Sequence, residues 1–245
     1  MSTTYTRNFL ANVVCRADFP LNLRLGSERP IDFQERLASA FPKASEGVIL
    51  QLEVPGGVPQ NITLKQPVIR WEFFARDMSS RVTLQRDFLS VETNKYQDFK
   101  QFWKLFEIPF QPLRDTYNPP VITRLGLRYQ NYLPLEPGDA DGWVGYLDPS
   151  LVEHLKFEHG KVLTQDSHSL QLDSGEIHIN FKYGVHNPDY PGPSRQRQFT
   201  LDIDCYIRDD IELDDVAKRL KDLNEEATDV FERSVGESWR ELMRN

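Results

Sequence analysis

The sequence predicts an α+β protein, in which a curved antiparallel sheet carries helices packed on one side. Stretches in which apolar and polar residues alternate, as in half-buried strands, recur along the chain. Between them lie segments whose apolar residues are three or four apart, as on the buried face of a helix. The 245 residues include 15 Phe, 9 Tyr and 4 Trp, which suffice for a large core and exclude a disordered chain.

The first half of the chain is predicted to run strand, helix, several strands, helix. Its elements are a strand over 9–17, a helix over 32–41, strands over 48–54, 68–76, 81–85 and 88–92, and a helix over 94–107. The alternation places Ile69 on the inward face of its strand. Pro42 ends the first helix, and Pro109 and Pro112 are expected to end the second, because proline lacks the N–H that a helix interior needs.

The second half repeats this order. Its elements are a strand over 121–132, a short helix over 148–157, strands over 162–172, 176–186 and 198–208, and a long helix from Asp210. Asp148 is a typical N-cap residue before Pro149 at the first helical position. The apolar series of the long helix is Leu213, Val216, Leu220, Leu223, Ala227 and Val230. We expect this helix to lie across the sheet, with a dimer seam as the alternative.

The repeated order predicts one compact unit, 1–245, with topologically similar halves at 8–112 and 120–233. Sequence identity between the halves is negligible, so the repeat concerns topology alone. One continuous sheet of the helix-grip or TATA-binding-protein type fits this order best. The proline-rich stretch 108–120 is the candidate seam between the halves.

Charge and cysteine content indicate the class of partner and the compartment. The formal charge is −8, from 37 acidic and 29 basic residues, which disfavours a duplex-DNA binder. The segment 209–245 holds 12 acidic and 6 basic residues, so the acidity points to a basic partner at the C-terminal helix. We expect Cys15 and Cys205 to be buried free thiols, with a disulfide as the alternative. The chain shows neither a signal peptide nor a membrane span, so a cytoplasmic protein is predicted.

Catalytic and cofactor motifs are absent from the sequence. It contains no phosphate-binding glycine loop, no G-x-S-x-G and no H-E-x-x-H, so an enzyme is disfavoured and no cofactor is predicted. Residues 139–142 imitate the start of a calcium loop but lack its later ligands. His154 and His159 are five residues apart, a spacing that does not place them on one side of a helix. No metal site is therefore predicted.

The strand over 121–132 carries the first candidate site. Arg124 and Arg128 flank Gly126 on one face, so that a bare backbone patch lies between two cationic side chains, with Asn131 nearby. Such a patch could bind a carboxylate or phosphate through bidentate contacts. The alternative is that both arginines pair with carboxylates on an ordinary polar sheet face.

A second candidate lies on the hairpin of the strands over 176–186 and 198–208. If the apolar residues of both strands share one face, the other face gathers His178, Asn180 and Lys182 with Asp202 and Asp204. A histidine near two aspartates could bind a ligand or transfer protons. The alternative is a solvated face stabilised by cross-strand charge pairs.

Several segments together resemble a known family. They are Phe33-Gln34, Phe41-Pro42, Trp71-x-Phe73, Thr93 with Tyr96, Phe99 and Phe102, and the string Arg124-Leu125-Gly126-Leu127-Arg128-Tyr129-x-Asn131. The sequence is similar to a sporadically distributed family of uncharacterised bacterial proteins of comparable length. The resemblance implies a bacterial cytosolic protein and supplies no reaction. The patchy distribution implies an accessory role, such as defence or toxin–antitoxin biology.

Three functions follow as hypotheses. The first is a non-catalytic binding protein whose acidic helix, through Asp214, Asp215, Glu225 and Glu226, docks a protein partner or a second copy of the chain. The second is a helix-grip ligand-binding protein or enzyme that holds an anion between Arg124 and Arg128. The third is a protein that binds single-stranded nucleic acid on the open sheet.

Overall fold

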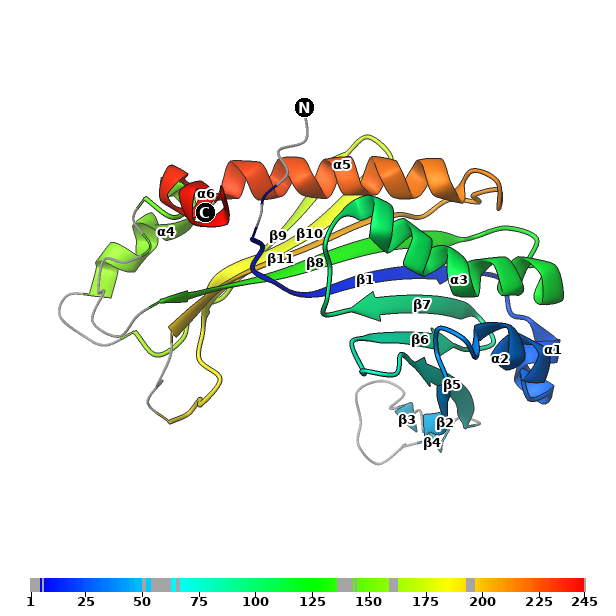
Figure 1. The fold of residues 1–245 in the computed structure, drawn as a ribbon. Helices are drawn as coiled ribbons and strands as arrows, with labels where there is room; N and C mark the ends of the chain where they lie inside the picture. Colours follow the sequence, from blue (N-terminus) through cyan, green and yellow to red (C-terminus); the bar gives the residue numbers. More distant parts are fainter. Residues whose placement is uncertain are drawn as a thin grey trace. The chain divides into compact units, whose positions relative to one another are not determined.

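A computed structural model describes residues 5, 7–49, 52–53, 63–64, 67–135, 143, 145–158, 163–192 and 197–244 (Figure 1). The chain divides into two compact units. Unit 1 consists of 1–13, 126–207 and 218–245, and unit 2 consists of 14–125 and 208–217.

Along the chain, the elements form runs of strands separated by single helices or pairs of helices (Figure 1). They are β1 (Leu10–Asp18), α1 (Leu23–Ser27), α2 (Ile31–Leu37), β2 (Lys43–Ile49), β3 (Leu52–Glu53), β4 (Thr63–Leu64), β5 (Val68–Phe74), β6 (Ser80–Leu84), β7 (Phe88–Thr93), α3 (Phe99–Tyr117), β8 (Arg124–Leu135), α4 (Pro149–Val152), the 3₁₀ helix η3 (Glu153–Glu158), β9 (His168–Ser174), β10 (Ile177–His186), β11 (Arg197–Ile207), α5 (Val216–Ser234) and α6 (Glu237–Arg244). Among the helices in these described ranges, none combines the length and apolarity needed to cross a bilayer.

The strands confirm the predicted α+β class with a large antiparallel sheet. Nine described strands follow the order β2-β5-β6-β7-β1-β8-β11-β10-β9, and β3 pairs with β4 separately. In unit 1, Ile179 lies opposite Cys205 and Phe181 opposite Ile203, which confirms the predicted phase of the β10–β11 hairpin.

The apolar face of unit 1 is covered by α5. The buried helix residues Leu220, Leu223 and Ala227 are spaced three and four apart, as predicted. The helix begins at Val216, however, and not at Asp210 as expected. The hydroxyl of Tyr129 on β8 donates to Asn224 of α5 at 2.8 Å, so the odd-numbered residues of β8 face this helix. The even-numbered face of these strands is consequently the polar one.

Helix α3 of unit 2 contradicts the prediction that Pro109 and Pro112 end it. The helix begins after Asp98, whose side chain accepts a hydrogen bond from the Gln101 N–H at 2.8 Å, and ends at Asn118 in the left-handed region. Both prolines are buried inside the helix. They lie on its apolar face, so the area buried by this face offsets the cost of about 3 kcal/mol for a proline in a helix interior.

Ile69 is not buried, although its strand position predicted an inward side chain, because the residue is 39% exposed. Ile69 lies opposite Val48 of β2, which is 58% exposed and belongs to the strand at one end of the sheet order. Alternation predicts which residues share a face but not whether another layer covers that part of the face. The sequence also did not predict α1, which Asn22 caps by accepting from the Leu25 N–H.

Both cysteines are buried and free, as predicted. Burial raises the pKa of the Cys205 thiol to about 12, with smaller contributions from Glu226 and Asp204. Burial raises the pKa of the Cys15 thiol as well, well above its ordinary value. Both groups are therefore neutral thiols at physiological pH.

We predict that neither thiol reacts with Ellman's reagent in the folded protein at pH 8, because the thiolate is the attacking species and both sulfurs are out of contact with solvent. Both should react once guanidinium unfolds the chain. The absorbance of the released thionitrobenzoate, before and after unfolding, measures this. Rapid stoichiometric labelling of the folded protein would contradict the burial of these thiols.

Candidate functional site

Arg128 lies on the polar face of unit 1 and is held by a carboxylate. Its Nε donates to Asp202 Oδ1 at 2.7 Å, and its Nη2 donates to Asp202 Oδ2. Asp202, on the neighbouring strand β11, is only 8% exposed. Hydrogen bonding to Asp202 raises the pKa of Arg128. The bidentate edge of the guanidinium is thus occupied by the protein itself.

Arg124 belongs to unit 2 and also lies near a carboxylate. Its Nη1 is 3.7 Å from Asp18 Oδ2, and Arg16 contacts the other oxygen of Asp18 at 2.6 Å. Each arginine of the predicted anion site therefore has a carboxylate in its own unit, the alternative considered from the sequence.

Asn131 lies on the opposite face of β8 from Arg128, since the two residues differ by an odd number of positions. It is 4% exposed, and its side-chain amide donates to the Leu201 carbonyl at 3.4 Å. Asn131 therefore satisfies a backbone group on the α5 side of the strands. Gly126 is buried on the same strand, on the face of Arg128.

The second predicted cluster is brought together in part. Asn180 lies opposite Asp204 and Lys182 opposite Asp202, as the alternation implies. His178 instead contacts Asp173 of β9, with 2.5 Å between its Nδ1 and the carboxylate, and its ring packs 5.2 Å from that of Tyr206. Within this cluster, Asp202 is held by Arg128 of β8 and His178 by Asp173 of β9, so the two groups do not share one site.

The predicted partner-binding residues divide between the units. Asp214 and Asp215 are exposed in unit 2, where Asp214 forms an ion pair with Arg114 at 2.5 Å. Glu225 is 3.4 Å from Lys221 on α5, and Glu226 is half-buried. The segment 209–215 holds five acidic residues and no basic one, whereas 218–244 holds seven acidic and six basic residues. The acidity of the C-terminal region is therefore concentrated in 209–215 of unit 2.

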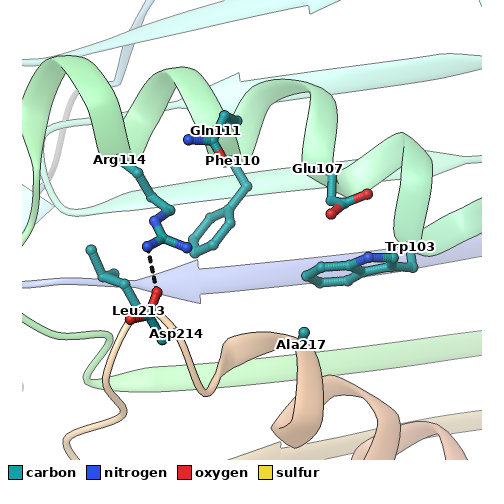
Figure 2. Close-up of a pocket in the computed structure, with 8 residues that line it drawn as sticks. All are labelled: Trp103, Glu107, Phe110, Gln111, Arg114, Leu213, Asp214 and Ala217. Atoms are coloured by element: carbon teal, nitrogen blue, oxygen red, sulfur yellow. Dashed lines mark hydrogen bonds and ion pairs between the residues drawn. The ribbon is translucent and has the colours of Figure 1, made fainter.

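A hollow of about 200 Å³ adjoins this acidic segment within unit 2 (Figure 2). Its lining residues are Trp103, Glu107, Phe110, Gln111 and Arg114 of α3 together with Leu213, Asp214 and Ala217. Their helical spacing places the α3 residues on one side of that helix. Figure 2 shows Arg114 reaching from α3 to Asp214, where the ion pair closes part of the rim. The sequence did not predict this hollow because α3 was expected to end at Glu107.

Three potential metal ligands converge in unit 1. They are His154 of η3, Asp166 in the segment before β9, and His168 of β9, and their ligand atoms all lie within 4.8 Å of one another. His154 Nε2 is 3.0 Å from Asp166 Oδ2 and 3.0 Å from His168 Nε2. His168 Nε2 is also 3.0 Å from Asp166 Oδ1. The side chains are 34%, 16% and 36% exposed, in chain order, so the cluster is open to solvent on one side.

Neighbouring strand residues fix this cluster. The Asp166 N–H donates to the Val185 carbonyl at 3.0 Å, and the His168 ring stacks on Tyr183 at 5.0 Å. Gly184 permits the Asp166 backbone to lie close to β10, because a Cβ at position 184 would be 2.3 Å from the Asp166 carbonyl oxygen. The sequence offered only Asp166-x-His168 as a signal. His159 and residues 139–142 lie outside the described residues.

A comparison with protein-family models gave no match to this chain, and a search of curated proteins also gave none. The family resemblance stays a prediction.

We predict that Arg128→Ala destabilises the protein by about 1–3 kcal/mol, since it leaves a nearly buried Asp202 carboxylate without its partner. Urea unfolding measures the change in the free energy of unfolding. Arg233→Ala is the control, because Arg233 is 78% exposed and pairs with Asp229 within one helix, a contact whose loss costs roughly 0.5 kcal/mol or less. Equal losses in both variants would contradict a structural role for the Arg128–Asp202 pair.

Proposed function

We propose that this chain is a non-catalytic binding protein that docks a basic segment of a protein partner on unit 2. The observation that carries the proposal is the hollow between α3 and 213–217, whose lining includes two aromatic rings and two carboxylates. The acidic segment 209–215 adjoins it. Aromatic and acidic groups in one concave site favour a cationic side chain.

A lysine or arginine of the partner would contact Trp103 and Glu107. Trp103 is half-buried and Glu107 is exposed, and the acidic group at the other end, Asp214, already pairs with Arg114. A cation over an indole ring gains about 0.5–2 kcal/mol, depending on how far water is excluded. The surrounding carboxylates would increase the rate of encounter with a basic partner.

The alternative functions have less support. An anion that binds Arg128 would have to displace Asp202 from both guanidinium contacts. Single-stranded nucleic acid would meet the five carboxylates of 209–215 if it approached the hollow, and these repel phosphate.

The proposal also includes a more specific scaffold and a biological role. We infer a helix-grip or TATA-binding-protein-like scaffold with halves at 8–112 and 120–233. A 19-residue helix lies at the end of each half and supports this scaffold, although α3 continues to Tyr117, past the inferred boundary at 112, and α5 continues to Ser234. We place the protein in the bacterial cytosol as the accessory member of a defence or toxin–antitoxin type system, with a homodimer as the alternative use of the acidic surface.

We predict that a fluorescent oligo-arginine peptide binds the 245-residue chain at low ionic strength and that Glu107→Lys weakens this binding about tenfold. Fluorescence anisotropy measures the affinity. Asp229→Lys is the matched control, because it makes the same change in net charge at an exposed carboxylate of unit 1. Trp103→Leu tests the contribution of the indole ring without any change of charge.

Two results would contradict the proposal. Equal weakening by Glu107→Lys and Asp229→Lys would mean that the peptide senses only the net charge. An affinity unchanged by both Glu107→Lys and Trp103→Leu would exclude the hollow as the docking site.

A further inference from the structure

We propose that His154, Asp166 and His168 bind a divalent transition-metal ion with the ligand preferences of Zn²⁺. Two imidazole nitrogens and one carboxylate are an established ligand set for such ions. The site is independent of the proposed docking function, since its three residues belong to unit 1 and the hollow belongs to unit 2.

The contacts within the cluster cannot all be satisfied by hydrogen bonds. Each ring nitrogen presents either a proton or a lone pair, and the carboxylate presents only lone pairs. If both Nε2 atoms carry protons, two N–H groups face each other across 3.0 Å. If one of them lacks its proton, its lone pair faces a carboxylate oxygen at 3.0 Å. A cation bound between the two Nε2 atoms and a carboxylate oxygen would attract a lone pair from each of them and so remove the conflict.

The separations match a metal site. Ligands 2.0–2.1 Å from a tetrahedral Zn²⁺ are about 3.3 Å apart, slightly more than the 3.0 Å contacts of the cluster. A small outward movement of the side chains would accommodate the ion. The partly exposed side chains leave room for water at the fourth position.

The surrounding structure holds the ligands in place. Asp166 is held through its backbone at Val185 and by the close approach that Gly184 permits, and His168 is held by its stacking on Tyr183. His154 follows α4, which Asp148 caps by accepting from the Ser150 N–H at 2.9 Å. Ligands from η3, the loop and β9 would let the ion link η3 to the strand β9. Because two of the ligands are imidazoles, Mg²⁺ and Ca²⁺, which prefer oxygen, should bind poorly.

Calorimetric titration of the 245-residue chain, carrying no histidine tag, with Zn²⁺ tests the site. We expect saturable binding of one ion per chain, a rise in the unfolding temperature with Zn²⁺, and no competition from millimolar Mg²⁺. His154→Asn and His168→Asn should each weaken Zn²⁺ binding at least about tenfold. The control is His178→Asn, because His178 is also an exposed histidine of unit 1 paired with a carboxylate, at Asp173. This control should stay within about twofold of the wild type.

Circular dichroism establishes whether each variant folds. If one of the two ligand variants misfolds, the other still tests the site. The proposal is overturned if the wild-type chain shows no saturable Zn²⁺ uptake. It is also overturned if folded His154→Asn and His168→Asn variants bind Zn²⁺ as well as the His178→Asn control does.

Discussion

The alternation of side chains along β8, β10 and β11 is the constraint on which the sites of unit 1 depend. Successive residues of a strand point to opposite faces, so the packing of the odd-numbered residues under α5 leaves Arg128, Asp202 and Lys182 on the other face. Asp202 is nearly buried there, and a buried carboxylate requires a partner. Arg128 is that partner. Arg128, which the sequence suggested as one side of an anion site, therefore pairs with a carboxylate of the neighbouring strand.

In unit 2, helix α3 positions the residues that line the hollow. Because the helix continues through its two prolines to Tyr117, its last turns carry Phe110, Gln111 and Arg114 to the hollow. Arg114 then pairs with Asp214 and fixes one side of the rim. The site with the best support for binding a partner thus depends on a helix whose buried apolar face outweighs the local preference of proline.

The sequence predicted most strands, both long helices and the α+β class, because these depend on the periodicity of apolar residues. It also predicted the two buried thiols and the phase of the β10–β11 hairpin. It failed where tertiary packing decides, as in the continuation of α3 and the exposure of Ile69. The cluster of His154, Asp166 and His168 was beyond sequence reasoning. Its assembly requires η3 to meet the start of β9 and Gly184 to admit the Asp166 backbone, and no local spacing encodes either event.

The polar side chains of the candidate sites in unit 1 mostly satisfy one another, and the convergence of His154, Asp166 and His168 is the described exception. Diffraction from crystals grown with Zn²⁺, recorded on both sides of the zinc absorption edge, tests most directly whether a metal ion resolves this conflict. We expect an anomalous peak about 2.0–2.2 Å from the Nε2 atoms of His154 and His168 and from an Asp166 oxygen. The absence of a peak there, with the three side chains still in contact, would contradict the proposed metal site.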